Sequence, residues 1–388
     1  MKILFSLTYY SPYISGLTLC VSRIAEGPAK DHEVCVLCMR HDSSLSLEER
    51  IGEIRKIRVI RANPILKISK GFLSVDWVIK SWIEVRKSDT VVVNLPQPEG
   101  IFPAFFAKLF GKKLITIYHC DLKLPVGILN AVAEALVTTS SWLTLQLSDK
   151  VITYTEDFAK NSRVLSRFLR KGIFIYPPII IPNINKRIQK SIRDKIGAGG
   201  QFVVGIAARL AAEKGIEYVL EALGELNNEK EKGRKSERER FKLIIAGPMN
   251  PVGEEEYKTK ILRLVEKYKD QVIFLGSIKP EEMGSFYSLL DVLVLPSVNS
   301  TEAFGMVQVE AMMYGVPVVA TDLPGVRVPV GKTGMGEIVP VKNAQAIAQS
   351  IEKILSDKKK YIKDQEKIEE EFSYNKSIKS YENILTSF

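Results

Sequence analysis

The chain has 388 residues, of which 46% are hydrophobic and 26% charged, a composition that excludes a disordered or fibrous protein and predicts two globular domains. Its formal charge of +10 is uneven, because residues 1–185 hold 24 Lys and Arg against 16 Asp and Glu, a net of +8. A basic half suggests an anionic partner, such as a membrane surface, a polyphosphate-linked acceptor or nucleic acid. An ordinary lysine-rich surface would give the same charge.

In residues 1–185, short apolar runs alternate with helical segments. Most of the runs are apolar throughout, as in a parallel sheet that is covered on both faces. The predicted strands are Lys2–Leu7, Val34–Met39, Ile57–Ile60, Thr90–Asn94, Lys113–Tyr118, Lys150–Tyr154 and Gly172–Ile175. After Tyr176-Pro177-Pro178 the pattern breaks, and Ile179–Ile184 reads as a linker. We therefore predict a Rossmann-like first domain over 1–185.

Two features of this half need interpretation. The run Leu124–Leu147 carries one charge, Glu134, and is long enough to span a bilayer, but its Pro, Gly and Thr/Ser content favours a buried helix. Cys35 and Cys38 form a CxxC within a predicted strand, where residues three apart face opposite sides. We therefore expect no metal site, and the reduced cysteines are typical of a cytoplasmic protein.

Residues 186–360 repeat the strand–helix alternation, which predicts a second doubly wound sheet. The predicted strands are Phe202–Ala207, Lys242–Ala246, Val272–Leu275, Asp291–Leu295, Pro317–Ala320 and Glu337–Val339. The predicted helices are Ile216–Leu226, Glu254–Tyr268, Pro280–Leu290 and Ala344–Ser356. The charged run at 229–240 reads as an exposed insertion, and 361–388 as C-terminal helices.

The stretch from Ser297 to Gly315 is the most informative part of the chain. Glu302 lies in a predicted strand-to-helix loop, and Glu310 lies within the helix that follows. The start of a helix offers unpaired N–H groups to a phosphate, whereas carboxylates accept hydrogen bonds from hydroxyls. A ligand in which phosphate groups lie beside hydroxylated rings is a sugar nucleotide.

A second loop adds positive charge at the same predicted sheet edge. Arg209 and Lys214 follow the first strand of the second domain, where they could bind phosphate oxygens. The chain has no G-x-G-x-x-G after a first strand and no G-x-x-x-x-G-K-[ST], which argues against a nicotinamide enzyme and a P-loop NTPase. His119 follows a strand of the first domain and is either functional or a packed residue.

Together these residues resemble the retaining glycosyltransferases of the B-type fold, which have two Rossmann-like domains (family 4-like, glycosyl transferases group 1). The matching motifs of the second domain are ARL…EKG, IIAGP, VIFLGSI, DVLVLPS and EAFGMVQVEAMMYGVPVVAT. The resemblance implies an α/β protein whose two doubly wound parallel sheets face each other across a cleft. It also implies that the C-terminal helix crosses back to the first domain.

The resemblance also implies roles for individual residues. Arg209 and Lys214 would hold the donor diphosphate, Glu302 the sugar hydroxyls and Glu310 the ribose hydroxyls. The remaining site residues would be Phe304, Gly305 and Met306 as backbone donors, Ser277 and Ile278 beside the base, and Gly16 and His119 from the first domain. The chain has Ser15 and Ala303 where the family usually has glycine, which puts the flexibility of one loop and the shape of the sugar pocket in question.

These expectations add up to a hexosyltransferase that uses a GDP- or UDP-hexose donor and a glycan or lipid-linked acceptor, with no cofactor and no nucleic-acid partner. No Asp-x-Asp lies near the proposed site, so we predict metal-independent retention by front-face attack. The alternatives are an epimerase or phosphorylase on a similar fold, and a non-catalytic nucleotide-sugar-binding subunit.

The basic first half also predicts peripheral binding to an anionic membrane. One candidate stretch carries Arg55, Lys56, Arg58, Arg61, Lys67 and Lys70 between apolar residues. A second is Phe102–Lys113, in which four apolar side chains adjoin three lysines. The alternative is that this second helix buries its Phe face on the sheet.

Overall fold

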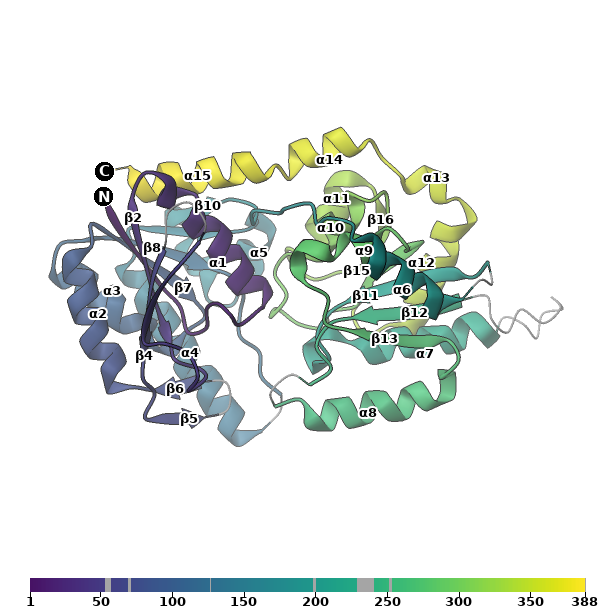
Figure 1. Ribbon diagram of the computed structural model, residues 1–388, viewed down its shortest axis with the longest axis horizontal. Helices are drawn as coiled ribbons and strands as arrows, with labels where there is room; N and C mark the ends of the chain where they lie inside the picture. The colour runs from purple at the N-terminus through teal and green to yellow at the C-terminus, as the bar shows by residue number, and fades with distance from the viewer. Residues whose placement is uncertain are drawn as a thin grey trace. The chain divides into compact units, whose positions relative to one another are not determined.

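The computed structural model describes residues 1–52, 57–68, 71–125, 127–197, 200–228, 241–250 and 253–387. It contains two compact units, one of Met1–Pro178 with Ser373–Phe388 and one of Ile179–Phe372 (Figure 1). Each unit is built around its own sheet of mainly parallel strands, which confirms the predicted α/β class. The charged run 229–240 lies outside the described residues.

The sheet of the first unit has the strand order β10-β9-β8-β7-β1-β2-β4-β3. Its strands are β1 (Lys2–Ser6), β2 (Glu33–Met39), β3 (Glu48–Ile51), β4 (Ile57–Ala62), β7 (Thr90–Leu95), β8 (Lys113–Tyr118), β9 (Lys150–Thr153) and β10 (Gly172–Phe174). All neighbours are parallel except β3 and β4. The seven predicted strands are confirmed. The short edge strand β3 and the two-stranded ribbon β5 (Leu66–Ile68) and β6 (Gly71–Leu73) were not predicted, because they have no long apolar run.

Helices cover both faces of this sheet (Figure 1). They are α1 (Gly16–Glu26), α2 (Val75–Lys87), α3 (Ile101–Leu109), α4 (Ile128–Leu147), α5 (Glu156–Asn161) and α15 (Tyr374–Thr386), with 3-10 turns at Pro28–Lys30, Pro98–Gly100 and Leu165–Lys171. The helices α2, α3 and α4 are successive neighbours on one face, and α1 packs with α15 on the other. Side-chain hydroxyl groups cap the N-termini of several of these helices. At α1, the Ser15 and Thr18 side chains form a capping box.

The helix α4 differs from its prediction as a buried helix. Among the described residues it alone is long and apolar enough to cross a bilayer, yet only 22% of its most apolar window is buried within the protein. Its buried residues are Val137, Ser140, Ser141, Thr144 and Leu145. The helix is therefore attached to the domain by one side of its second half.

The C-terminal helix α15 belongs to the first unit. Thr90 Oγ1 donates a hydrogen bond to Leu385 O at 3.1 Å, and Lys113 Nζ donates one to Ile384 O at 2.6 Å. The preceding helix α14 (Gln365–Glu371) belongs to the second unit, where the Phe372 ring packs edge-on against Phe304 with 6.0 Å between centroids. The chain thus changes units between 372 and 373, whereas the sequence suggested a boundary at 360.

The sheet of the second unit has the order β13-β12-β11-β14-β15-β16, with every pair parallel. Its strands are β11 (Phe202–Ala207), β12 (Phe241–Ala246), β13 (Val272–Gly276), β14 (Val292–Leu295), β15 (Val318–Thr321) and β16 (Gly336–Val339), and all six were predicted. The linker Ile179–Ile184 belongs to this unit and not to the first.

The helices of the second unit are α6 (Lys186–Ile196), α7 (Ile216–Asn228), α8 (Glu255–Val265), α9 (Gly284–Tyr287), α10 (Met306–Met312), α11 (Arg327–Thr333), α12 (Ala344–Ser356), α13 (Lys358–Tyr361) and α14. Helix α7 buries Ile216, Val219, Leu220 and Leu223, which recur at helical spacing, against the sheet and α12. Each such side chain contributes about 1.5–3 kcal/mol when it is fully buried.

The predicted helix Pro280–Leu290 is instead a 3-10 turn (Pro280–Glu282) followed by the short α9. Gly284 stands at the junction, and a Cβ atom there would lie 2.3 Å from the Tyr314 hydroxyl and 2.5 Å from Pro182 O. The glycine therefore permits close packing at a cost in helix propensity.

Candidate active site

The segments that follow strands β11, β13 and β14 carry most of the predicted site residues. Ala207, Ala246 and Gly276 are in register across β11, β12 and β13. Backbone hydrogen bonds continue past the strands, from Ala208 N to Ala246 O and from Gly247 N to Gly276 O, each at 2.9 Å. The loops after β11 and β13 therefore start from one sheet edge, where ligands of such sheets bind.

The loop after β11 holds a fixed arginine. The Nε atom of Arg209 donates to Glu213 Oε1 at 3.2 Å, and a second guanidinium nitrogen bonds the same oxygen. Burial by itself would raise the pKa of Glu213, but the charges of Arg209 and Lys214 outweigh it and hold that pKa below its ordinary value. The carboxylate is therefore ionised at neutral pH and orients the guanidinium.

The same loop is fastened to the loop after β14. Val298 N donates to Glu213 O at 3.0 Å. Gly215 has a φ of +61°, and a Cβ atom at this position would lie 2.3 Å from Pro296 O. Only glycine fits both the left-handed backbone and this close approach.

Lys214 and Glu302 are brought into direct contact by these two loops. The Lys214 Nζ atom lies 2.6 Å from Glu302 Oε2, and the two side chains are 20% and 17% exposed. Lys214 was predicted to bind phosphate and Glu302 to bind the sugar. The two side chains form one ion pair that is partly buried and still accessible from the surface.

The residues after Glu302 lead into helix α10. Gly305 is its N-cap with a φ of +76° and no side-chain cap, and a Cβ atom there would lie 2.4 Å from Leu295 Cδ2. The amide of the buried Gln308 donates to Phe304 O at 2.7 Å and to Val326 O at 2.9 Å, which fixes the turn. The Phe304 ring is buried and Gly305 has no side chain, so both residues can contact a ligand only through backbone atoms. The backbone N–H of Met306, at the first helical position, can do the same.

Glu310 lies on α10, and its Oε2 atom accepts a hydrogen bond from the Tyr287 hydroxyl at 2.8 Å. The fully buried Tyr287 therefore fixes the orientation of the Glu310 carboxylate. Ser277 and Ile278 directly follow β13, with Ser277 exposed and Ile278 half-buried. This placement is compatible with their predicted position beside a base.

The two predicted site residues of the first unit differ in exposure. Gly16 is exposed at the first position of α1. His119 is buried, and its Nε2 and Nδ1 atoms bond Asn94 Oδ1 at 3.0 Å and the Tyr154 hydroxyl at 2.5 Å. The Asn94 amide nitrogen donates to Ser6 O, so its oxygen accepts from His119 Nε2–H.

Burial lowers the pKa of His119 to about 3, so the ring is neutral at physiological pH. In this unit His119 has the contacts of a packed residue, which was the alternative to a functional role. A contact between His119 and a sugar stays a prediction.

Two residues of the site were missed by sequence reasoning. Glu213 stands four residues after Arg209, a spacing that could have suggested the ion pair. No signal in the sequence could have found Tyr287, because its contact with Glu310 joins two separate helices.

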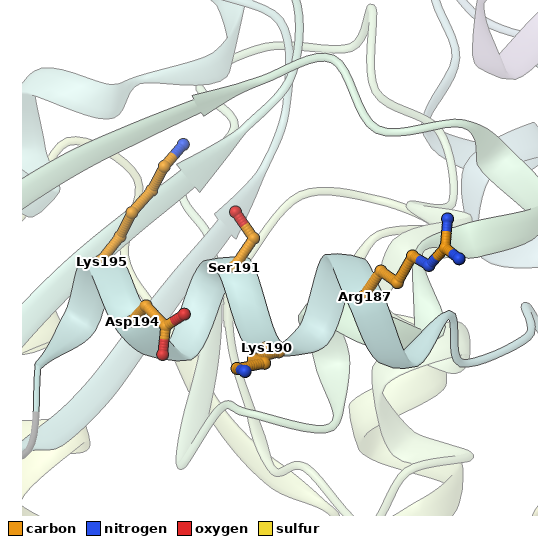
Figure 2. Close-up of a pocket in the computed structure, with 5 residues that line it drawn as sticks. All are labelled: Arg187, Lys190, Ser191, Asp194 and Lys195. Carbon is orange, nitrogen blue, oxygen red and sulfur yellow. The ribbon is translucent and has the colours of Figure 1, made fainter.

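A surface hollow lies elsewhere in the second unit (Figure 2). It is lined by Arg187, Lys190, Ser191, Asp194 and Lys195, all from helix α6. None of these residues belongs to the predicted site, so the hollow has no part in it.

Comparison with known proteins gives concordant matches. The family model described as glycosyl transferases group 1 matches residues 188–372, the part that contains the loops described above. The alpha-D-kanosaminyltransferase of Streptomyces kanamyceticus is 32% identical over 331 residues, which covers 79% of this chain and 82% of that protein.

Other matches extend the likeness. An uncharacterised glycosyltransferase of Methanocaldococcus jannaschii is 31% identical over 176 residues, 45% of this chain but only 41% of that protein. The crystal structure of HepE from Anabaena in complex with UDP and glucose superposes over the whole of both chains with a TM-score of 0.75 at 21% identity. This structural likeness concerns the fold.

Proposed function

Because the chain belongs to the glycosyl transferases group 1 family, we propose that it transfers a hexose from a nucleotide-sugar donor to a glycan or lipid-linked acceptor. The protein is a glycosyltransferase, and its donor, its acceptor and its mechanism are what we propose. GDP- and UDP-hexoses are the donor class, and no further cofactor is required.

The contact between Lys214 and Glu302 carries this proposal. A sugar nucleotide presents a diphosphate next to a hydroxylated ring, so its site needs a cation and a hydroxyl acceptor side by side. The 2.6 Å pair supplies both at the end of the sheet, and Arg209 stands in the same loop as Lys214. Arg209 and Lys214 would bind the diphosphate, and Glu302 the sugar hydroxyls.

The neighbouring residues extend the site in both directions. Glu310, held by Tyr287, would accept hydrogen bonds from the ribose hydroxyls, with Ser277 and Ile278 beside the base. The backbone N–H groups of Phe304, Gly305 and Met306 would bind sugar and phosphate oxygens. Gly16 and His119 would contribute from the first unit.

The same groups support retention of configuration without a metal as the mechanism that we propose. Two cations and a helix start can neutralise the charge that develops on the leaving diphosphate. The leaving phosphate would take the proton of the attacking hydroxyl on the same face of the sugar. Glu302 in this scheme binds the donor sugar and is not a nucleophile.

Release of nucleoside diphosphate from GDP- and UDP-hexoses, with and without a panel of acceptors, tests the proposal. We expect release that depends on an acceptor, unchanged activity in EDTA, and a product whose anomeric configuration by NMR equals that of the donor. Conversion of the donor without any acceptor would indicate an epimerase. Phosphate-dependent cleavage would indicate a phosphorylase, and tight donor binding with no turnover a non-catalytic subunit.

A further inference from the structure

We propose that the outward face of helices α2, α3 and α4, here called the apolar face, docks the first unit on the surface of an anionic phospholipid bilayer. This inference concerns where the enzyme works and does not depend on its donor. It rests on exposed apolar side chains, on their contrast with the second unit, and on the charges around them.

Helix α2 exposes an apolar stripe that continues onto α3. Val75, Ile79 and Trp82 recur at helical spacing and are 60%, 53% and 41% exposed. The Trp82 ring packs edge-on against Phe106 and Phe110 of the α3 segment, with centroids 5.2 and 4.7 Å apart. The two helices therefore present one continuous aromatic surface.

Helix α3 turns its small residues inward and its large ones outward. Pro103, Ala104 and Ala107 are buried, whereas Phe105 and Leu109 are 54% and 55% exposed. The alternative stated for this segment, a Phe face buried on the sheet, is therefore wrong. Small inward residues let the helix lie close to the sheet and leave the phenyl rings outside.

Helix α4 shows the same inversion most clearly. Three of its five buried residues, Ser140, Ser141 and Thr144, carry hydroxyls, and Ser140 Oγ donates to Pro98 O. Its outward residues are apolar and include Ile128 and Leu129, which are 86% and 87% exposed, with Leu136 and Trp142 further along. A helix whose buried side is mainly hydroxyl and whose exposed side is mainly apolar suits an apolar environment around it.

The second unit shows that the fold does not require this exposure. It has the same type of sheet with helices on it, yet among the described residues of its helices Leu262 is the sole large apolar side chain that is similarly exposed. Large exposed apolar patches mark interaction sites. The apolar face is thus a property of this chain's first unit and not of its architecture.

Charge identifies the occupant as an anionic surface. The three acids on these helices are all in ion pairs: Asp76 with Lys80, Glu84 with Arg58 and Lys87, and Glu134 with Lys123. The exposed Arg86 lies in the last turn of α2, and the half-buried Lys112 lies three residues after the end of α3. Lys108, in the last turn of α3, is paired with Asp149. Aromatic rings bordered by cations are the composition of an interfacial surface on anionic lipid.

The helices lie on the membrane and do not cross it. Helix α4 packs on β8 and on the turn at Pro98 through its inward side, which a spanning helix could not keep. In the first basic stretch suggested by the sequence, two arginines are already engaged within the domain. Arg58 is paired with Glu48 and Glu84, and Arg61 is fully buried in an ion pair with Glu49. Arg55, Lys56 and Lys70 lie outside the described residues.

Vesicle co-sedimentation of the full chain tests this inference. We expect binding to vesicles of equal parts phosphatidylcholine and phosphatidylglycerol at low salt, and weaker binding to pure phosphatidylcholine or at high salt. The double variant Phe105→Ser with Leu129→Ser should weaken binding by about tenfold or more, because both side chains are already exposed in the fold. The matched control Leu262→Ser on α8 should bind like the wild type.

Tryptophan fluorescence gives an independent reading. Of the three tryptophans, Trp82 and Trp142 lie on the apolar face and Trp77 is buried. Brominated lipid should quench the wild type, and the double variant Trp82→Phe with Trp142→Phe should lose most of the quenching. Absence of binding to anionic vesicles at low salt would overturn the inference. A second outcome would also overturn it: the wild type is a dimer that does not bind vesicles, and the Phe105→Ser, Leu129→Ser variant is a monomer. The apolar face would then join two copies of the chain.

Discussion

The ammonium group of Lys214 and the carboxylate of Glu302 are 88 positions apart in the chain and 2.6 Å apart in the structure. The lysine comes from the loop after β11 and the glutamate from the loop after β14, two strands that are neighbours in the sheet. The pair is fixed by the Glu213–Val298 backbone bond and by Gly215 against Pro296. The site is therefore organised by loop-to-loop contacts at one sheet edge.

Substitutions at this pair should separate sugar binding from phosphate binding. Glu302→Ala should lower transfer at least about tenfold, because a hydrogen bond to a charged group contributes about 1.5–3 kcal/mol. Affinity for the free nucleoside diphosphate should not fall, since Lys214 loses its protein partner and keeps its charge. Lys214→Ala should weaken that affinity, as calorimetric titration would measure. Normal turnover in Glu302→Ala would contradict the assigned role.

Glu310 should act on the nucleoside end of the donor. Glu310→Ala should weaken the binding of nucleoside diphosphate by about tenfold, because the ribose hydroxyls lose a charged acceptor. Tyr287→Phe keeps the carboxylate and removes its 2.8 Å hydrogen bond, so it should have a smaller effect in the same direction. Equal affinities in all three proteins would show that Glu310 only packs its helix.

Gly215→Ala should damage both stability and activity. The left-handed backbone costs a non-glycine residue about 1–2 kcal/mol, and the new methyl group would also meet Pro296 O. We expect a lower midpoint of urea unfolding and weaker donor binding. Gly331→Ala is the control, since a methyl group there meets nothing within 4 Å and lies in α11, where alanine should stabilise by about 0.5–1 kcal/mol. Equal midpoints for the two variants would contradict this account.

Two buried groups of the first unit should give opposite pH dependences of stability. Burial lowers the pKa of His119 from 6.5 to about 3, so between these values only the unfolded chain binds the proton and stability rises with pH. Burial raises the pKa of Glu99 from 4.5 to about 7, although Thr8 donates a hydrogen bond to it. Over that range only the folded chain binds the proton, and stability falls as pH rises.

The two contributions oppose each other between pH 4.5 and 6.5. Each amounts to at most about 1.4 kcal/mol per pH unit. Relative to the wild type, His119→Gln should therefore lose stability as pH rises through this range, and Glu99→Gln should gain it. Urea unfolding at several pH values measures both slopes, and parallel curves for the wild type and both variants would refute the assignment.

Much of the fold was predictable because its signals are local. A parallel strand buried on both faces is a short apolar run, so β1, β8 and β11 could be located to within a residue or two. The turns at Gly215 and Gly305 also depend on the local sequence, because each has a positive φ that favours glycine. The order strand, loop, helix then assigned Arg209, Lys214, Glu302 and Glu310 to the ligand edge of a sheet.

What the sequence could not specify are relationships between distant segments. The edge strand β3 exists only because β4 pairs with it, and the inward side of α4 is defined only by the sheet beneath it. The sequence predicted roles for Lys214 and Glu302 singly, but their contact required β11 to lie beside β14. Periodicity reports the burial of a segment over about ten residues, whereas strand order is set by the packing of the whole sheet, so only the tertiary structure could bring the two charges together.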